Sequence, residues 1–320
     1  MEDKPWLKHY DEGVPHHIDY PAVPLFTLLE QTAQKYPETP CTIFKGAKIT
    51  YREMNGLTDR LAAGLAELGV KKGDRVGLFM PNTPQFVTAY FAVLKLGAVV
   101  VATNPLYSAR EIEHQVNDAG IEIMIVMSNF YNLLKQVQPK TKIRKVVVTN
   151  LKEALPPVLS FLFTLTKEKQ GGFRVQLAEN DVWMQDLINR HKPEDRPKVD
   201  VGPDDTGLFQ YSGGTTGISK GAIAMHRNLV ANAIQIRMWN TNTVDGAEVV
   251  LMAIPLSPEV RAQVKTNFLL LGQQNDVYWS DAYEIYVNDP NTTNMTAQLV
   301  PTLLLWMFVD MAEAAETQMH

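Results

Sequence analysis

The sequence predicts an α/β fold, a doubly wound parallel sheet flanked by helices. Short apolar runs alternate with longer segments in which apolar residues recur every three or four positions, as they do in strands and helices. The apolar runs lack a polar face, so each strand is expected to be covered by helices on both sides, which is typical of parallel sheets. Right-handed crossovers between such strands then give a doubly wound sheet.

Composition limits the classes of protein to consider. The 320 residues are 45% hydrophobic and 20% charged, enough for one large or two ordinary globular domains. A net charge of −5 argues against a nucleic-acid partner. Cys41 is the only cysteine, so no intrachain disulfide can form. Because no apolar signal core or spanning run is present either, we expect a cytoplasmic protein, at most peripheral at the inner membrane surface.

Local signals place the first elements. Residues 1–24 are rich in proline, histidine and acidic residues and are expected to form an extended arm. Residues 25–36 carry apolar side chains on one helical face. Residues 42–45 and 47–50 are predicted to form a hairpin that turns at Gly46.

Two capping boxes mark helix starts in the next region, Thr50 with Glu53 and Ser108 with Glu111. Glycines are expected to end the helices that these boxes open. Helices are predicted over residues 50–68, 84–96, 108–119 and 130–137. Strands are predicted over residues 75–80, 98–103, 121–127 and 145–149.

Residues 150–203 interrupt this alternation. Residues 155–165 are strongly apolar and are followed by Lys167, Lys169 and Arg174. The run is too short to cross a bilayer. We expect an insertion that packs on the sheet; the alternative is a segment lying in a membrane interface with its lysines near lipid headgroups. Residues 191–203, with three prolines and alternating charges, are expected to link to the next strand.

The most distinctive stretch is residues 211–221, which contains four glycines. Glycine lets backbone N–H groups approach a ligand closely, and successive N–H groups form a nest that holds an anion. The hydroxyls of Ser212, Thr215 and Thr216 add donors, and Lys220 adds a positive charge. This composition suits polyphosphate binding; the alternative is a flexible hairpin loop.

The spacing differs from that of the common nucleotide-hydrolase phosphate loop, in which Gly and four residues precede Gly-Lys and Ser or Thr. Counted from Gly214, the fifth position is Ser219, and Lys220 is followed by Gly221. A nicotinamide dehydrogenase is also disfavoured, because no strand leads into Gly-x-Gly-x-x-Gly at a helix start. The loop is flanked by two predicted strands and then a helix, over residues 206–211, 221–225 and 228–239.

The same stretch resembles the phosphate loop of the adenylate-forming (AMP-binding) superfamily, which includes acyl-CoA synthetases, luciferases and peptide-synthetase adenylation domains. The family string is a hydroxyl residue, Ser or Gly, Gly-Thr-Thr-Gly, two residues and Lys-Gly; here it is Ser212-Gly-Gly-Thr-Thr-Gly-Ile-Ser-Lys-Gly221. The opening, from Trp6 to Tyr20, resembles the long-chain fatty acyl-CoA branch. Further family-like segments are Ile49-Thr-Tyr-Arg-Glu53, Gly69-Val-Lys-Lys-Gly-Asp-Arg-Val76, Met80-Pro-Asn82, Leu96-Gly-Ala98, Asn104-Pro105 and His226-Arg-Asn-Leu229.

This resemblance implies an AMP-forming long-chain fatty acid–CoA ligase. ATP and a fatty acid would form an acyl-adenylate and pyrophosphate, and CoA would then displace AMP. ATP and Mg²⁺ are the implied cofactors and CoA the co-substrate. A fatty-acid substrate would make peripheral membrane contact through residues 155–169 useful. The implied phosphate-binding residues are Ser212, which is also the candidate Mg²⁺ ligand, Gly213, Gly214, Thr215, Thr216, Gly217 and Lys220.

The resemblance weakens after residue 256. Pro258 stands where the family has a histidine, and the family motifs for the adenine pocket, the acidic magnesium ligand, the hinge and the C-terminal small domain with its catalytic lysine have no counterpart. The catalytic residue is therefore unknown. We expect a first α/β subdomain over 1–203, containing the arm and the 150–203 insertion and linker, and an incomplete second subdomain over 204–320. Activity is expected to be impaired in this truncated chain; the alternative is a non-catalytic nucleotide-binding fragment or scaffold.

Overall fold

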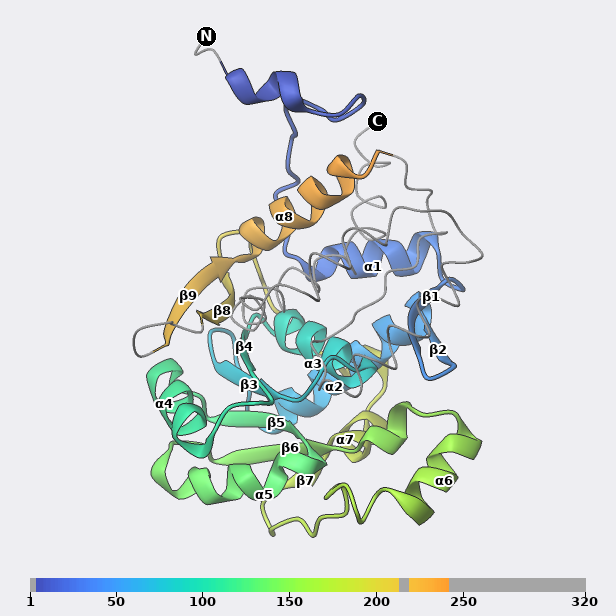
Figure 1. Cartoon of the computed structure of the whole chain (residues 1–320), viewed down its shortest axis with the longest axis vertical. Coiled ribbons are helices and arrows are strands. Elements are labelled where there is room, and N and C mark those ends of the chain that lie inside the picture. Colours follow the sequence, from blue (N-terminus) through green and yellow to red (C-terminus); the bar gives the residue numbers. More distant parts are fainter. Residues whose placement is uncertain (1–3, 213–218, 242–320) are drawn as a thin grey trace, which may run out of the picture.

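The computed structural model describes residues 4–212 and 219–241 (Figure 1). Predictions that fall on residues 213–218 and 242–320, including most of the phosphate loop and of the second subdomain, lie outside the described residues. The helices are η1 Pro5–His9, α1 Phe26–Lys35, α2 Tyr51–Glu67, α3 Pro84–Lys95, α4 Ala109–Ala119, α5 Ser128–Val137, η2 Gln138–Lys140, η3 Leu151–Ala154, α6 Pro157–Thr166, α7 Met184–Arg190, η4 Pro193–Asp195 and α8 His226–Trp239. The strands are β1 Pro40–Phe44, β2 Ala47–Thr50, β3 Arg75–Phe79, β4 Val99–Thr103, β5 Ile123–Met127, β6 Lys145–Thr149, β7 Val182–Trp183, β8 Thr206–Ser212 and β9 Lys220–Met225.

A seven-stranded sheet in the order β7-β6-β5-β3-β4-β8-β9 forms the centre of the molecule. Strand β3 pairs in parallel with β4 on one side and β5 on the other, so the chain reverses its winding direction after β4. The predicted doubly wound α/β fold is therefore confirmed. The edge strand β9 differs, because it runs antiparallel to β8. The short connection between β8 and β9 cannot make the crossover that a parallel partner requires.

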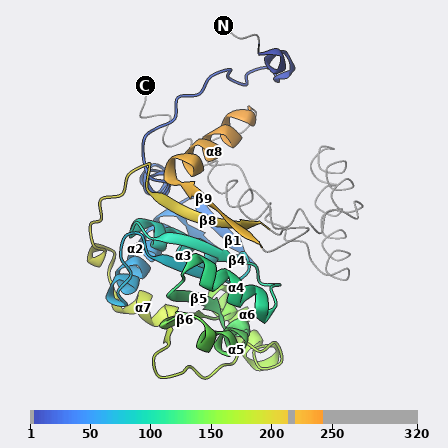
Figure 2. The ribbon, with the colours of Figure 1, turned by 90° about the vertical axis from the view of Figure 1, so that its left-hand side faces the viewer.

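The two faces of the sheet are covered by different helices, as Figure 2 shows with α2 on one side and α4 and α5 on the other. Successive strand residues point to opposite faces, so Leu78 packs in the layer of α2 and α3 whereas Phe79 packs in that of α4 and α5. All residues of β5 are buried. This double coverage explains why the central strands are apolar without alternation.

Both predicted capping boxes are confirmed. At the start of α2, the Glu53 amide donates to Thr50 Oγ1 over 3.2 Å and the Thr50 amide donates to Glu53 Oε2 over 2.8 Å. At the start of α4, the Ser108 amide donates to Glu111 Oε2 over 2.7 Å. Gly120 follows α4 with a φ of 67°, a conformation that favours glycine.

Residues 150–203 hold more structure than the sequence predicts. Strand β7 pairs with β6, and α7 packs along α2, where a Cβ added to Gly64 would lie 2.8 Å from Leu187 Cβ. These two elements are too short to give a periodic signal. The expectation that residues 155–165 pack on the sheet is wrong for α6, in which no residue is buried. None of the described helices combines the length and apolar character that a membrane span requires.

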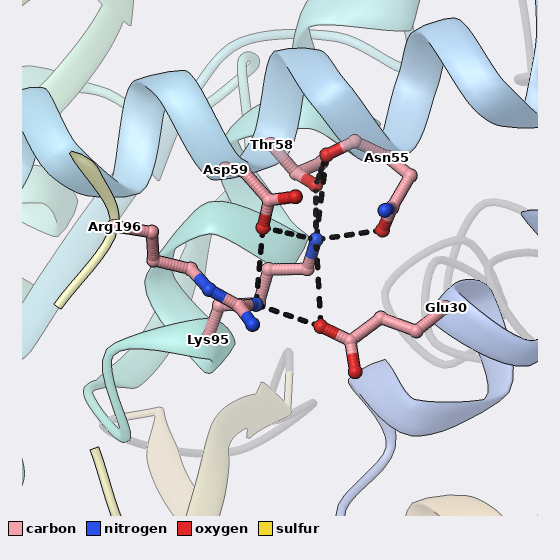
Figure 3. Close-up of polar contacts among 6 residues, drawn as sticks. All are labelled: Glu30, Asn55, Thr58, Asp59, Lys95 and Arg196. Atoms are coloured by element: carbon pink, nitrogen blue, oxygen red, sulfur yellow. Dashed lines mark hydrogen bonds and ion pairs between the residues drawn. The ribbon is translucent and has the colours of Figure 1, made fainter. Parts of the chain in front are cut away.

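The predicted linker is held by a buried cluster of polar side chains (Figure 3). The Lys95 ammonium, on a residue that is 2% exposed, donates to Asp59 Oδ1 over 2.7 Å. Arg196, from the linker, lies 3.0 Å from Asp59 Oδ1 and 2.7 Å from Glu30 Oε1. The members of this cluster come from α1, α2, α3 and the linker: Glu30, Asn55, Thr58, Asp59, Lys95 and Arg196. Because Arg196 is tied to two carboxylates, the linker is fixed to the helices.

Residues after 203 continue the first sheet, because β8 pairs in parallel with β4. The register places Val100 opposite Leu208 and Val101 opposite Phe209. The division of the chain into 1–203 and 204–320 stays a prediction. Within the described residues, the segment that leads into the phosphate loop is part of the same sheet as β3–β7.

Candidate phosphate-binding site

The two ends of the glycine/threonine loop are held together by an antiparallel pair of strands. Ser212, the last residue of β8, pairs with Lys220, the first residue of β9. Cα atoms of such partners lie about 5 Å apart. Two of the predicted phosphate contacts are therefore adjacent, and Lys220 is exposed. The other predicted contacts lie outside the described residues: Gly213, Gly214, Thr215, Thr216 and Gly217.

The strand pair places the loop at a favourable edge of the sheet. Because β8 is parallel to β4, its carboxyl end lies at the same edge as the carboxyl ends of the other parallel strands. Ligands of open α/β sheets bind outside this edge. The predicted strands over 206–211 and 221–225 and the helix that follows them are confirmed by β8, β9 and α8, each of which starts or ends within a few residues of the prediction.

Helix α4 contacts the chain on both sides of the loop. The Tyr211 hydroxyl donates to Asp118 Oδ2 just before the loop, and His114 Nε2 lies 3.2 Å from the Ser219 carbonyl oxygen just after it. Since a carbonyl only accepts, His114 Nε2 is the donor. His114 and Asp118 are four residues apart and share one face of α4. One helix face therefore fixes both flanks of the loop.

The ring of Tyr211 explains one of the glycines. Tyr211 pairs with Gly221 across the strands, and a Cβ added to Gly221 would lie 2.9 Å from Tyr211 Cζ. Tyr211 is 4% exposed, and this burial, together with the hydrogen bond to Asp118, raises the pKa of its hydroxyl. The ring is thus neutral and firmly placed. Gly221 leaves room for this ring, a role that the sequence alone does not indicate.

His226 joins the strand pair to the N-terminal region. It begins α8, is completely buried, and accepts a hydrogen bond at Nδ1 from the Leu25 amide over 3.1 Å. Burial lowers the pKa of His226 to about 4, with the Asp205 carboxylate opposing the shift. The imidazole is therefore neutral at physiological pH. Its contacts indicate a structural role behind the loop.

Two surface hollows lie on opposite layers of the molecule. One, of about 400 Å³, lies along α4 and is lined by Arg110, Glu113, His114, Asn117 and Asp118. Another, of about 630 Å³, lies between α2 and residues 189–193 in the other helix layer. Of these two hollows, the one along α4 is lined by His114 and Asp118, which contact the described residues on either side of the loop.

Comparison with known proteins identifies the family of the chain. The family model of AMP-binding enzymes matches residues 29–319. A long-chain-fatty-acid–CoA ligase of Bacillus subtilis is 34% identical over 259 residues, which cover 80% of this chain and 46% of that one. A long-chain-fatty-acid–CoA ligase of Escherichia coli O157:H7 is 35% identical over 260 residues, covering 79% of this chain and 46% of that one. The chain thus spans about half the length of the curated relatives it matches.

Solved structures show the same fold. A long-chain-fatty-acid-CoA ligase from Archaeoglobus fulgidus superposes with a TM-score of 0.58 at 28% identity, covering 72% of this chain and 42% of that one. An anthranilate CoA ligase in complex with anthranoyl-AMP superposes with a TM-score of 0.56 at 22% identity, covering 70% of this chain and 38% of that one. The doubly wound sheet agrees with these folds, and the family model covers most of the chain. The chain belongs to the AMP-binding enzyme family.

Proposed function

We propose that this chain provides the phosphate-binding part of a ligase that activates a long-chain fatty acid with ATP and transfers it to CoA. The single observation that carries the proposal is the pairing of Ser212 with Lys220 at the carboxyl edge of the sheet. This pairing holds the two ends of the loop next to each other. The names of the curated relatives support the choice of a long-chain fatty acid. The location expected from the sequence, cytoplasmic and at most peripheral at the inner membrane surface, belongs to the same proposal.

The chemistry requires stabilisation of negative charge. When a carboxylate attacks the α-phosphorus of ATP, charge builds up on the phosphate oxygens and on the departing pyrophosphate. In our proposal, the hydroxyls of Thr215 and Thr216, the Lys220 ammonium and the amides around Gly213 and Gly214 donate to these oxygens. The clamped flanks would hold the donors in place before ATP binds, so that little reorganisation is needed.

We propose that magnesium enters as part of the ATP substrate. Within the described residues no three His, Cys, Asp or Glu side chains gather as a metal site, and the nearby Asp118 is already hydrogen-bonded to Tyr211. Mg²⁺ commonly keeps several waters and is held by substrate phosphates with one or two protein oxygens. From its position in the family motif, we propose the Ser212 hydroxyl as a protein ligand of Mg²⁺–ATP. The ion would neutralise phosphate charge when it is bound.

The test is the exchange of labelled pyrophosphate into ATP with a panel of fatty acids. Any exchange that the chain performs should be lost in Lys220→Ala and in Thr215→Ala and kept in Lys48→Ala, an exposed lysine on β2. The alternative, a non-catalytic nucleotide-binding fragment or scaffold, would show no exchange but would be stabilised thermally by ATP in a manner that depends on Lys220. Absence of both exchange and ATP-dependent stabilisation would refute the phosphate-loop assignment.

A further inference from the structure

Helix α6 turns its apolar side to solvent. Val158, Phe161, Leu162 and Leu165 are spaced i, i+3, i+4 and i+7, so they form one stripe on the helix. These side chains are 71%, 65%, 47% and 66% exposed. We refer to this stripe as the apolar face of α6. Contiguous exposed apolar surface of this kind marks an interaction site.

The opposite side of α6 faces the protein and is more polar. Ser160, Phe163 and Thr164 are half-buried, and Thr164 Oγ1 donates to the Ser160 carbonyl over 2.9 Å. Phe163 packs edge-on against Phe173 with ring centroids 5.2 Å apart. The helix is therefore rotated so that its small polar residues lie inward. Packing within the described residues leaves most of its large apolar side chains outside, with Phe163 as the exception.

A buried carboxylate fixes α6 in this orientation. Glu168, just after the helix, is 4% exposed and accepts from Lys152 Nζ over 2.7 Å, Arg174 Nη2 over 3.3 Å and Asn150 Nδ2 over 3.2 Å. The Phe173 amide donates to the Glu168 carbonyl over 2.8 Å. Burial alone would raise the pKa of Glu168, but Lys152 and Arg174 lower it, so the carboxylate stays charged. The end of α6 is thus tied to the residues that follow β6.

Positive charge lies at the end of the apolar face. Lys167 and Lys169 are exposed immediately after α6, and Glu168, the acidic residue between them, is directed to Lys152 and Arg174 instead. No residue from Pro157 to Thr166 is charged. An apolar helix face next to exposed lysines matches a bilayer surface, with acyl chains below and anionic headgroups at its level. A second copy of the chain would instead bring the same lysines to the contact, where like charges would repel each other.

We propose that the apolar face of α6 inserts shallowly into one leaflet of a membrane that contains anionic phospholipid, with Lys167 and Lys169 at the headgroups. The proposal does not depend on nucleotide binding. Strands β6 and β7, which α6 joins, lie at one end of the sheet order and β8 and β9 at the other. Figure 1 shows α6 at the lower right and the β8–β9 pair on the left. Changes in α6 can therefore be tested without touching the phosphate loop.

The experiment measures co-sedimentation of the full chain with vesicles of phosphatidylcholine containing phosphatidylglycerol, and with vesicles of phosphatidylcholine alone. We expect binding to the anionic vesicles that weakens as salt is added. The double variant Phe161→Asp/Leu165→Asp should bind more than about tenfold more weakly, because it places charges in the acyl region. The matched control is Ile43→Asp on β1, where the native side chain is 52% exposed, and it should bind like the parent.

A second pair of variants tests the charges. Lys167→Ala/Lys169→Ala should lose about fivefold in affinity per lysine, from the usual contribution of a basic residue near an anionic surface. Lys48→Ala/Lys71→Ala removes the same net charge from exposed positions elsewhere and should have little effect. The proposal is wrong if the parent chain does not bind anionic vesicles, or if the α6 variants bind as well as their controls. It is equally wrong if the apolar variants only convert a dimer to a monomer in light scattering, since a second copy would then cover the face.

Discussion

In the buried cluster around Lys95, removing the charge of Asp59 should cost more stability than removing the charge of Lys95. The side chain of Lys95 is completely inaccessible to solvent, whereas that of Asp59 is 12% accessible and also lies 3.0 Å from Arg196. In Asp59→Asn the Lys95 ammonium keeps only neutral hydrogen-bond partners and Glu30 at 3.9 Å. An ion left buried after loss of its partner costs about 3–5 kcal/mol.

The reverse change should cost less. Lys95→Met keeps an unbranched chain of similar volume, removes the buried charge and leaves Asp59 paired with Arg196. We expect a loss of about 1–2 kcal/mol, from weakened hydrogen bonds that are partly offset by the relieved desolvation. The double variant Asp59→Asn/Lys95→Met should then be more stable than Asp59→Asn alone, because the unpaired ammonium is gone.

The assay is urea unfolding at neutral pH, followed by circular dichroism. The three variants and the parent give a double-mutant cycle whose interaction energy measures the coupling between Asp59 and Lys95. Equal losses for the two single variants, or a double variant less stable than Asp59→Asn, would refute the reasoning. Burial lowers the pKa of Lys95 while Asp59 and Glu30 oppose the shift, so the penalty in Asp59→Asn should also shrink at alkaline pH as the ammonium loses its proton.

Three further predictions concern the flanks of the phosphate loop. His226 has a pKa of about 4 when folded and about 6.5 when unfolded, so between these pH values only the unfolded chain binds the proton. The free energy of unfolding should therefore fall by about 3 kcal/mol from pH 6.5 to pH 4. In His226→Asn, whose amide oxygen can accept from the Leu25 amide, this dependence of stability on pH should be weaker, and an unchanged dependence would contradict the assignment. Gly221→Ala should lower ATP affinity about tenfold, equivalent to about 1.4 kcal/mol, because the added methyl group displaces the Tyr211 ring. The ATP-dependent thermal shift measures this loss, and Gly56→Ala on α2 is the control that should leave it unchanged. Ser108→Ala should destabilise the chain by about 1 kcal/mol through loss of the α4 cap, whereas Ser108→Asn should keep most of the stability in the same unfolding assay.

Local sequence patterns determined most of the element positions. The pairs Thr50/Glu53 and Ser108/Glu111 predicted helix starts because a capping box depends only on residues within one turn. Apolar runs such as β5 predicted buried strands because their side-chain period is set by the strand itself. The glycine/threonine motif likewise predicted a loop between two strands. Each of these signals is carried by near neighbours in the chain.

Tertiary structure decided which distant residues meet. Helix α4 contacts the chain next to the loop through the hydrogen bond from the Tyr211 hydroxyl to Asp118, 93 residues away, and no local pattern specifies that pairing. The same holds for Arg196, which fixes a segment predicted as a simple linker. Helix α6 shows most clearly what the sequence cannot predict, because an apolar run has the same sequence whether it faces a core or solvent. Its orientation follows from the contacts of Glu168 and Phe163, so long-range packing, and not residue type, selects the exposed face.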